Sequence, residues 1–281
     1  MPTNDELLEQ QRINWTKAAP GWERWGDWLE GQSRDLTAWL CDAAGLEPGC
    51  RALDLACGSG QPAATAAMRV RPGGRVTAVD LSPAMVEATR RKAGRLGLDN
   101  LDVREMDMQA LTFDEASFDA ATCRFGLMFC PDPVRAASEV HRVLRPGGRF
   151  ALAVWDEPAR NPFFTLIAEV VSRFVPLPPP DPAVPGVFRL APRSELDRVL
   201  RAAGFSTIAV EPRPMTFGFA SPEEYWRVQA DLASPLRSAV ATLEAADLAR
   251  LEAAVLDAAA RHVKDGTVRL AAVPLCARAV K

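Results

Sequence analysis

The sequence has few of the side chains that most often act as a catalytic base, and it has no long apolar run. It contains 2 histidines and 1 tyrosine among 281 residues. His141 and His262 both fall in predicted helices, where a structural role is favoured over base catalysis. No apolar stretch approaches the roughly 20 residues that span a bilayer, so we expect no stable membrane insertion. Residues 1–14 are polar and acidic, which predicts no signal peptide and a cytoplasmic location.

An excess of one charge and closely paired cysteines are also missing. The 33 basic and 36 acidic residues give a formal net charge of −3, and no basic cluster stands out. Because nucleic-acid phosphates call for patches of lysine and arginine, we expect a small-molecule partner and no nucleic acid. The 6 cysteines show neither C-x-x-C spacing nor the density of a disulfide scaffold, so we expect mostly free, buried thiols. A homodimer stays open.

The most informative stretch is LDLACGSG, residues 53–60. Its first half is short and apolar, as expected of a buried parallel strand, and Gly58 and Gly60 let the backbone come close to a bound group. The next apolar run ends at Asp80. Since the carboxyl ends of parallel strands form the ligand crevice of a doubly wound sheet, Asp80 is placed to accept both hydroxyls of an adenosine ribose.

Strand and helix patterns alternate along the first half of the chain. Five such units predict a parallel sheet with helices on both faces, which is an α/β fold. Beyond them we expect a helix over 194–203, a strand over 206–211 and a last strand over 268–280. The five strands of the first half are predicted at 51–56, 75–80, 101–106, 118–123 and 149–155.

The glycine stretch fits two cofactor classes. Residues 58–63 also match the G-x-G-x-x-A pattern of nicotinamide dehydrogenases. Three further features favour a different family: Asp54 within the first strand, Asp107 at the end of the third, and the run RVLRPGGRF at 142–150. On these residues the chain resembles the class I S-adenosylmethionine-dependent methyltransferases, closely over about residues 50–155.

The resemblance implies a fold, a cofactor and a set of residues that bind it. The fold would be a Rossmann-like doubly wound sheet of seven strands, mostly parallel with an antiparallel last strand, plus helical lid elements. The cofactor would be S-adenosylmethionine, with S-adenosylhomocysteine as product, and no metal is expected. The loop backbone would face the methionine part, Asp80 would hold the ribose, and Asp107 with Met108 would flank the adenine. Ala56 stands where the family often has a glycine. The residues expected to bind the cofactor are Asp54, Ala56, Cys57, Gly58, Gly60, Gln61, Asp80, Leu81, Asp107, Met108 and Cys123.

We divide the chain into an N-terminal helical lid, residues 1–48, and a class I methyltransferase domain, residues 49–281. Within that domain, a proline-rich connection at 175–187 is expected to be extended and stiff, and to cross the surface near the pocket. A helical insertion at 213–266 is expected to form a cap over the acceptor.

Aromatic and apolar side chains of the lid and of the segment after the fourth strand are the candidates for binding the acceptor. The tryptophans recur at helical spacing, so they either pack onto the sheet or close over the substrate, and both readings stay open. The candidates are Trp15, Trp22, Trp25, Phe125, Met128 and Phe129.

Catalysis has fewer candidates. Methyl transfer from a sulfonium is an in-line displacement, so orientation can supply much of the rate and a dedicated base is sometimes unnecessary. Arg124 follows the fourth strand at the crevice and could pair with an anionic or enolate oxygen; its alternative is an ion pair within the fold. Tyr225 could donate to the substrate or merely anchor Trp226.

Over its whole length the chain is most similar to the ubiquinone and menaquinone methyltransferase group and its natural-product relatives. That resemblance implies a small, largely apolar acceptor, aromatic or quinol-like, methylated on carbon, oxygen or nitrogen. Two alternatives stay open. An arsenite methyltransferase would use the thiolates of Cys57, Cys123 and Cys130. A non-catalytic regulatory protein would bind S-adenosylmethionine without turnover.

Overall fold

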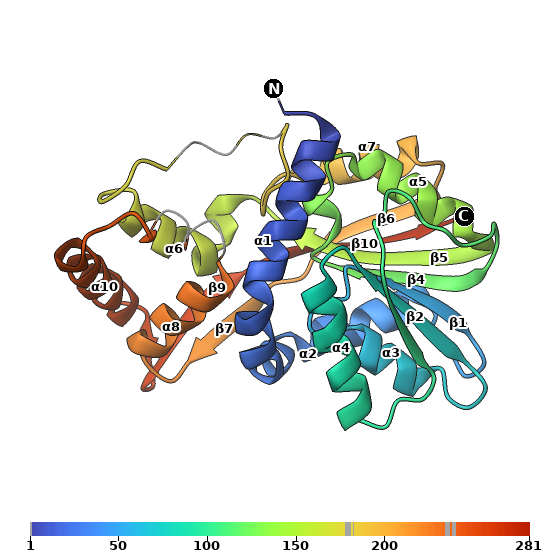
Figure 1. Ribbon diagram of the computed structural model, residues 1–281, viewed down its shortest axis with the longest axis horizontal. Coiled ribbons are helices and arrows are strands. Elements are labelled where there is room, and N and C mark those ends of the chain that lie inside the picture. Colours follow the sequence, from blue (N-terminus) through green and yellow to red (C-terminus); the bar gives the residue numbers. More distant parts are fainter. Residues whose placement is uncertain (1, 178–180, 182, 234–236, 238–239) are drawn as a thin grey trace.

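A seven-stranded sheet forms the core of the larger part of the molecule, on the right in Figure 1. The computed structural model describes residues 2–177, 181, 183–233, 237 and 240–281. The strands of the main sheet are β1 Arg51–Leu55, β2 Arg75–Asp80, β3 Leu101–Glu105, β4 Phe118–Arg124, β5 Leu144–Trp155, β6 Ser206–Pro212 and β10 Pro274–Val280. Their order is β3-β2-β1-β4-β5-β10-β6, and β10 runs antiparallel to both of its neighbours. This confirms the predicted doubly wound sheet with an antiparallel last strand.

Helices cover both faces of this sheet because its strands are apolar on both sides. Small residues such as Ala52, Ala120 and Ala151 point to the face that α2 and α3 cover. Larger ones such as Leu53 and Leu152 point to the other face, covered by α5 and α7. The helices of this unit are α1 Asn4–Arg24, α2 Gly26–Ala44, α3 Ala63–Arg69, α4 Pro83–Arg95, α5 Pro133–Val143 and α7 Arg193–Ala202.

The prediction of one last strand over 268–280 is wrong, because two strands of different sheets share that segment. β9, Thr267–Ala272, pairs with β7 and β8 in a three-stranded sheet, whereas β10 enters the main sheet. The break lies at Val273, whose N–H donates to Asn161 Oδ1 at 2.8 Å and whose carbonyl accepts from Asp156 N at 2.9 Å. The N–H and the carbonyl of Val273 therefore bond to the segment after β5, and neither group takes part in the strand pairing of β9 or β10.

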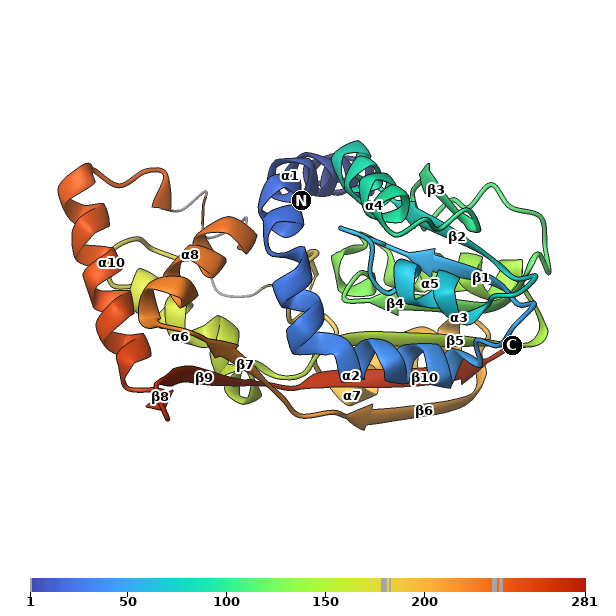
Figure 2. The same cartoon turned by 90° about the horizontal axis from the view of Figure 1, so that it is seen from below.

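The predicted cap insertion at 213–266 is not purely helical. It begins with strand β7, Met215–Phe219, and ends with strand β8, Val263–Lys264, which flank helices α8, Pro222–Leu232, and α10, Ala245–Ala260. Figures 1 and 2 show the small sheet, α6 (Pro162–Val171), α8 and α10 grouped beyond one edge of the main sheet. By this edge we mean the side of the sheet where the parallel strands have their carboxyl ends, since Trp155 at the end of β5 pairs with Pro274 at the start of β10.

Two other predicted segments differ in detail. The fifth strand begins at Leu144, earlier than predicted, and the Pro-Gly-Gly turn forms an excursion at its start. Part of the proline-rich connection, residues 178–180 and 182, lies outside the described residues. Among the residues that are described, we find no helix with the length and apolar character to cross a bilayer.

Candidate active site

The glycine loop after β1 folds into a tight turn. Ala56, Gly58 and Gly60 have φ angles of 52°, 55° and 106°, in the left-handed region that favours glycine. A Cβ at Gly60 would lie 2.9 Å from Lys92 Cδ, so only glycine fits without a shift there. Ala56 adopts its angle without being glycine, which costs on the order of 1 kcal/mol and is typical of functional turns.

Asp80 ties the end of β2 to this loop. Its Oδ2 accepts from Gly58 N and its Oδ1 accepts from Ser82 N, both at 2.9 Å. Burial raises the pKa of Asp80 to about 6, although the backbone N–H groups oppose the shift. Each carboxylate oxygen keeps a further lone pair, so the group can still accept hydroxyls such as those of a ribose.

Asp54 is the one strongly shifted carboxyl inside the first strand. Its Oδ1 accepts from Thr122 Oγ1 at 2.6 Å, whereas its buried Oδ2 has no hydrogen-bond partner among the described residues. Burial raises the pKa of Asp54 to about 7. A buried acceptor without a partner costs about 1–3 kcal/mol, so a cationic donor brought by a ligand would be stabilised here.

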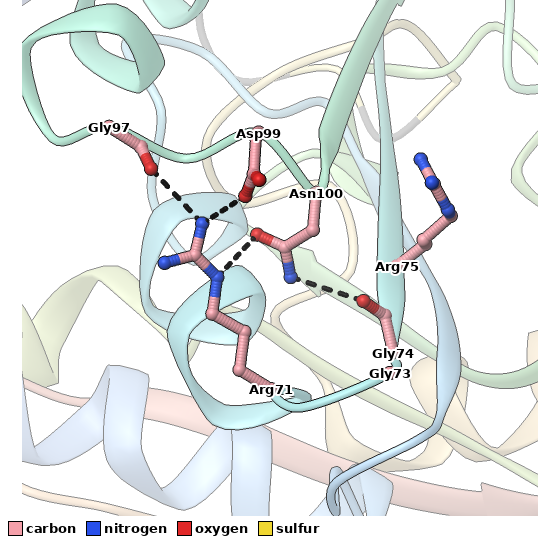
Figure 3. Close-up of a pocket in the computed structure, with 7 residues that line it drawn as sticks. All are labelled: Arg71, Gly73, Gly74, Arg75, Gly97, Asp99 and Asn100. Atoms are coloured by element: carbon pink, nitrogen blue, oxygen red, sulfur yellow. Dashed lines mark hydrogen bonds and ion pairs between the residues drawn. The ribbon is translucent and has the colours of Figure 1, made fainter.

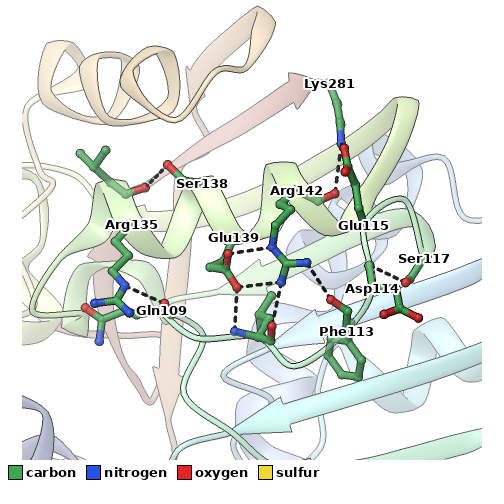
Figure 4. A network of polar contacts seen from close by, with 12 residues as sticks. Gln109, Phe113, Asp114, Glu115, Ser117, Arg135, Ser138, Glu139, Arg142 and Lys281 are labelled. Carbon is green, nitrogen blue, oxygen red and sulfur yellow. Dashed lines mark hydrogen bonds and ion pairs between the residues drawn. The ribbon is translucent and has the colours of Figure 1, made fainter.

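The loop after β3 is held in place by helix α5 (Figure 4). Arg142 donates to the carbonyls of Leu111 and Phe113, each at 2.7 Å, and Arg135 donates to Gln109 O at 2.9 Å. Within the loop, Asp107 Oδ1 accepts from Gln109 N at 2.9 Å. This anchoring fixes Asp107 beside the end of β3, next to the loops after β1 and β2.

The turn after β4 presses against the glycine loop. Phe125 has a φ of 62°, and its N–H donates to Ala153 O at 2.8 Å. A Cβ at Gly126 would overlap Ala56 Cβ and lie 2.9 Å from Cys123 Sγ, so the two loops touch through a position that only glycine can fill. Gly126 was not among the predicted site residues.

Arg124 fastens helix α2 to the end of β4. Its Nη1 donates to Thr37 Oγ1 at 2.8 Å, to Ser33 Oγ at 2.9 Å and to Glu30 Oε2 at 3.3 Å. The backbone of Ser33 is non-helical, so Arg124 binds α2 at a kink. No bond from Nε or Nη2 is found within the described part of the chain, so these donors can serve a ligand.

The N-terminal helices contact the loops that follow β1 and β2. Thr16 Oγ1 of α1 is 3.0 Å from Ser82 Oγ, and a Cβ at Gly26 would lie 3.6 Å from Ser59 Oγ. Trp25 Nε1 donates to Asp231 Oδ2 of α8 at 2.8 Å, which gives this predicted substrate residue a fixed partner in the fold. The two views in Figures 1 and 2 agree that α1 runs between α4 and α8.

A continuous cluster of aromatic side chains lines the carboxyl edge of β4 and β5. The rings of Phe125 and Trp155 stack in parallel, with centroids 4.0 Å apart and planes inclined by 8°. Trp155 also contacts Phe164 edge to face at 4.9 Å. Trp155 was not among the predicted site residues, although it is the last residue of a predicted strand, where the crevice was expected. The cluster comprises Trp25, Trp28, Phe125, Trp155, Phe163, Phe164, Phe188, Phe217, Phe219 and Tyr225.

The other predicted acceptor residues fall in two places. Trp15 meets Trp22 and Phe129 edge to face, with centroids 5.6 and 4.9 Å away, so these three form a second aromatic group between α1 and the segment after β4. Met128 is fully buried in the core. Tyr225 is buried too, and its hydroxyl donates to Phe163 O at 3.1 Å, so this placement supports anchoring within the cap over catalysis.

Two of the remaining cofactor candidates, Gln61 and Cys57, have structural partners. Gln61 Oε1 accepts from Thr65 Oγ1 at 2.9 Å at the start of α3. Cys57 Sγ lies 3.5 Å from Thr89 Oγ1, and burial raises the pKa of its thiol well above the usual range. Burial likewise raises the pKa of Cys123 to about 12. Leu81 follows Asp80 and is partly exposed.

A surface cavity of about 410 Å³ lies away from this site (Figure 3). It is bordered by Arg75, the first residue of β2, and therefore opens at the amino edge of the sheet. Arg71 in this cavity is bonded to Asp99, Asn100 and Gly97 O. Arg71, Asp99 and Asn100 are thus bonded to one another or to the backbone, and we assign the cavity no part in the chemistry.

Comparisons with known proteins agree with this geometry. Residues 53–152 match a family model described as a methyltransferase domain. The chain is 34% identical over 161 residues to a 2-phytyl-1,4-naphtoquinone methyltransferase of Nostoc sp., covering 57% of this chain and 70% of that one. It is 35% identical over 176 residues to a demethylmenaquinone methyltransferase of Renibacterium salmoninarum, covering 61% and 70%.

Solved structures show the same fold. A phosphoethanolamine N-methyltransferase 2 of Haemonchus contortus, in complex with S-adenosylhomocysteine, aligns with a TM-score of 0.58 at 17% identity, covering 100% of this chain and 60% of that one. The [4+2]-cyclase SpnF aligns with a TM-score of 0.53 at 25% identity, covering 87% and 79%. The chain belongs to the class I S-adenosylmethionine-dependent methyltransferases, and within them it is similar to the menaquinone methyltransferases.

Proposed function

We propose that this enzyme methylates a small, flat, largely apolar aromatic acceptor, of the quinol or naphthol kind, by in-line displacement. The observation that carries the proposal is the parallel stack of Phe125 on Trp155 at the carboxyl ends of β4 and β5. In a doubly wound sheet this edge borders the ligand crevice. The two relatives named above are, by their names, quinone-type methyltransferases, which agrees with a flat acceptor.

The residues present fit S-adenosylmethionine. The unpartnered Oδ2 of Asp54 suits the ammonium group of the methionine part, which would give this buried atom a charged donor. Asp80 would accept the ribose hydroxyls, and the loop at Gly58 and Gly60 leaves the backbone open to the methionine part. Asp107, fixed beside the end of β3, would lie along the adenine together with Met108.

The chain's own contribution to the reaction is orientation. When bound, the cofactor supplies a methyl group activated by a sulfonium. Holding an acceptor in line with such a group supplies much of the rate, and this demands rigid walls. The stacked rings provide one wall, and α1 with Trp15 and Phe129 provides another. The free Nε and Nη2 donors of Arg124 would steady an anionic oxygen on the acceptor.

The arsenite alternative is not retained. It requires accessible thiolates, yet Cys57, Cys123 and Cys130 are buried. Burial raises the pKa of all three thiols, which disfavours the thiolate form at neutral pH.

A panel of phenols, quinols, naphthols and aliphatic amines, incubated with cofactor labelled in the methyl group, tests the proposal. We expect label on a flat aromatic acceptor together with release of S-adenosylhomocysteine, which separates methyl transfer from other chemistry on the same fold. Cofactor binding without any S-adenosylhomocysteine release across the panel would favour the regulatory alternative.

A matched pair of variants locates the acceptor. Phe125→Leu should raise KM for the flat acceptor by about 2- to 12-fold, the range for one lost aromatic pair. Phe113→Leu is the control, because Phe113 contacts Phe118 at the amino end of β4, away from the crevice. Equal effects in both variants would remove Phe125 from the acceptor site.

A further inference from the structure

The indole N–H of Trp22 is buried without an acceptor. Among the described residues, Trp22 Nε1 and Asp54 Oδ2 are the two buried side-chain polar atoms that lack a hydrogen-bond partner. Native proteins leave few such atoms, and each calls for an explanation. Asp54 Oδ2 already falls in the cofactor site, so the position of Trp22 relative to that site matters.

Trp22 lies on a segment that spans two loops of the cofactor site. At one end of this segment, Thr16 Oγ1 is 3.0 Å from the hydroxyl of Ser82, whose N–H binds Asp80. At the other end, Gly26 approaches the glycine loop at Ser59. Trp22 itself packs against a small cluster that includes Met85, in the first turn of α4 beside Ser82. Trp22 therefore lies on the helix that packs against α4 and against the turn that carries the ribose-binding carboxylate.

Trp25 provides a direct contrast on the next turn of the chain. Its indole N–H donates to Asp231 Oδ2 at 2.8 Å, and Arg24 pairs with the same carboxylate at 2.6 Å. The fold thus supplies an acceptor for one tryptophan of this region. For Trp22 it supplies burial and ring packing, and no acceptor within the described residues.

We propose that Trp22 Nε1 donates to a ribose oxygen of the bound cofactor, so that the lid closes on the methyl donor. This inference rests on the proposed function, because it takes the cofactor site as assigned above. An indole N–H can only donate. A ribose hydroxyl can donate its proton to Asp80 and accept from the indole with a lone pair on the same oxygen. Both groups are then satisfied by one ligand atom.

The assignment changes the role of the lid. Trp22 was a candidate for binding the acceptor, whereas a bond to the ribose makes α1 responsive to the cofactor. Helix α1 then becomes better ordered when the cofactor binds, and it completes the wall of Trp15 and Phe129 before the acceptor arrives. Cofactor binding should precede acceptor binding.

The test is Trp22→Phe, which removes the donor and keeps an aromatic ring. Calorimetry of the full chain with S-adenosylhomocysteine should show Kd raised by about 2- to 12-fold, the range for one neutral hydrogen bond. Trp25→Phe is the matched control; it removes a donor whose partner is Asp231, so its Kd should equal that of the wild type. Hydrogen exchange should show that ligand-induced protection of residues 4–24 falls in Trp22→Phe and persists in Trp25→Phe.

A second ligand identifies the contacted atoms. 5′-Methylthioadenosine keeps the ribose and lacks the amino-acid part, so Trp22→Phe should weaken its binding by the same factor. A loss confined to S-adenosylhomocysteine would place the contact on the carboxylate and overturn the ribose assignment. Unchanged binding of both ligands would overturn the inference while leaving the proposed function intact. A wild-type chain that bound neither ligand would instead overturn the proposed cofactor site.

Discussion

Asp54→Asn should remove a pH dependence of cofactor binding that the wild type shows. The pKa of Asp54 is raised to about 7 by burial, so much of this carboxyl is protonated below neutrality in the free protein. A ligand ammonium binds the ionised form and lowers the pKa again. Affinity for S-adenosylhomocysteine should therefore rise with pH, by about eightfold between pH 6 and 7.5, or about 1.2 kcal/mol.

Calorimetry across that range measures the effect, and Asp80→Asn is the control. The pKa of Asp80 is raised to about 6, so its own protonation adds only about twofold at pH 6. Most of the pH dependence should remain in Asp80→Asn, whereas only the roughly twofold part that comes from Asp80 should remain in Asp54→Asn. A change of about eightfold or more that survived in Asp54→Asn would refute the assignment of the ammonium to Asp54.

The raised pKa of Asp54 also affects the stability of the free protein. A rise in pH strengthens cofactor binding but lowers this stability. Because folding raises the pKa of Asp54, the folded state holds its proton more tightly, and this contribution to stability is lost as pH rises from about 4 to 7. Free Asp54→Asn should therefore melt at a higher temperature than the wild type at pH 7.5. A lower Tm at that pH would contradict the account of Asp54 as a destabilising buried charge.

Three substitutions test the neighbouring groups. Asp80→Ala should weaken S-adenosylhomocysteine binding by about 1.5–3 kcal/mol, measured by calorimetry, because hydrogen bonds to a charged group are lost; unchanged affinity would remove Asp80 from the site. Arg124→Met should lower kcat more than cofactor affinity, and equal losses in both would leave Arg124 only its role in fastening α2. Gly126→Ala should destabilise the fold by about 1–3 kcal/mol in denaturant unfolding, since its Cβ would overlap Ala56; a wild-type midpoint would show that the two loops can separate freely.

The sequence predicted best where local pattern and position suffice. The strands ending at Leu55 and Asp80 are short apolar runs followed by turn residues. The sequence therefore predicts where each strand ends and that both ends lie on the same side of the sheet. The break at Val273 could not, because it depends on the side chain of Asn161, which lies 112 positions away. The partners of Trp25 and Tyr225 are similarly distant, on α8 and α6, and periodicity carries no information about such pairs.

The strand that crosses from the small sheet to the main sheet bears on how an acceptor enters. β9 and β10 are joined through Val273 alone, and that residue is bonded on both sides to the segment after β5. Hydrogen bonds of the Val273 backbone therefore hold the small sheet against the main sheet, and we do not expect it to move as a hinged lid. Helix α1 is held differently, by side-chain contacts such as Thr16 to Ser82 and Arg24 to Asp231. Exchange of acceptor and product is expected on that side, where loosening a few side chains opens a path and no strand has to be broken.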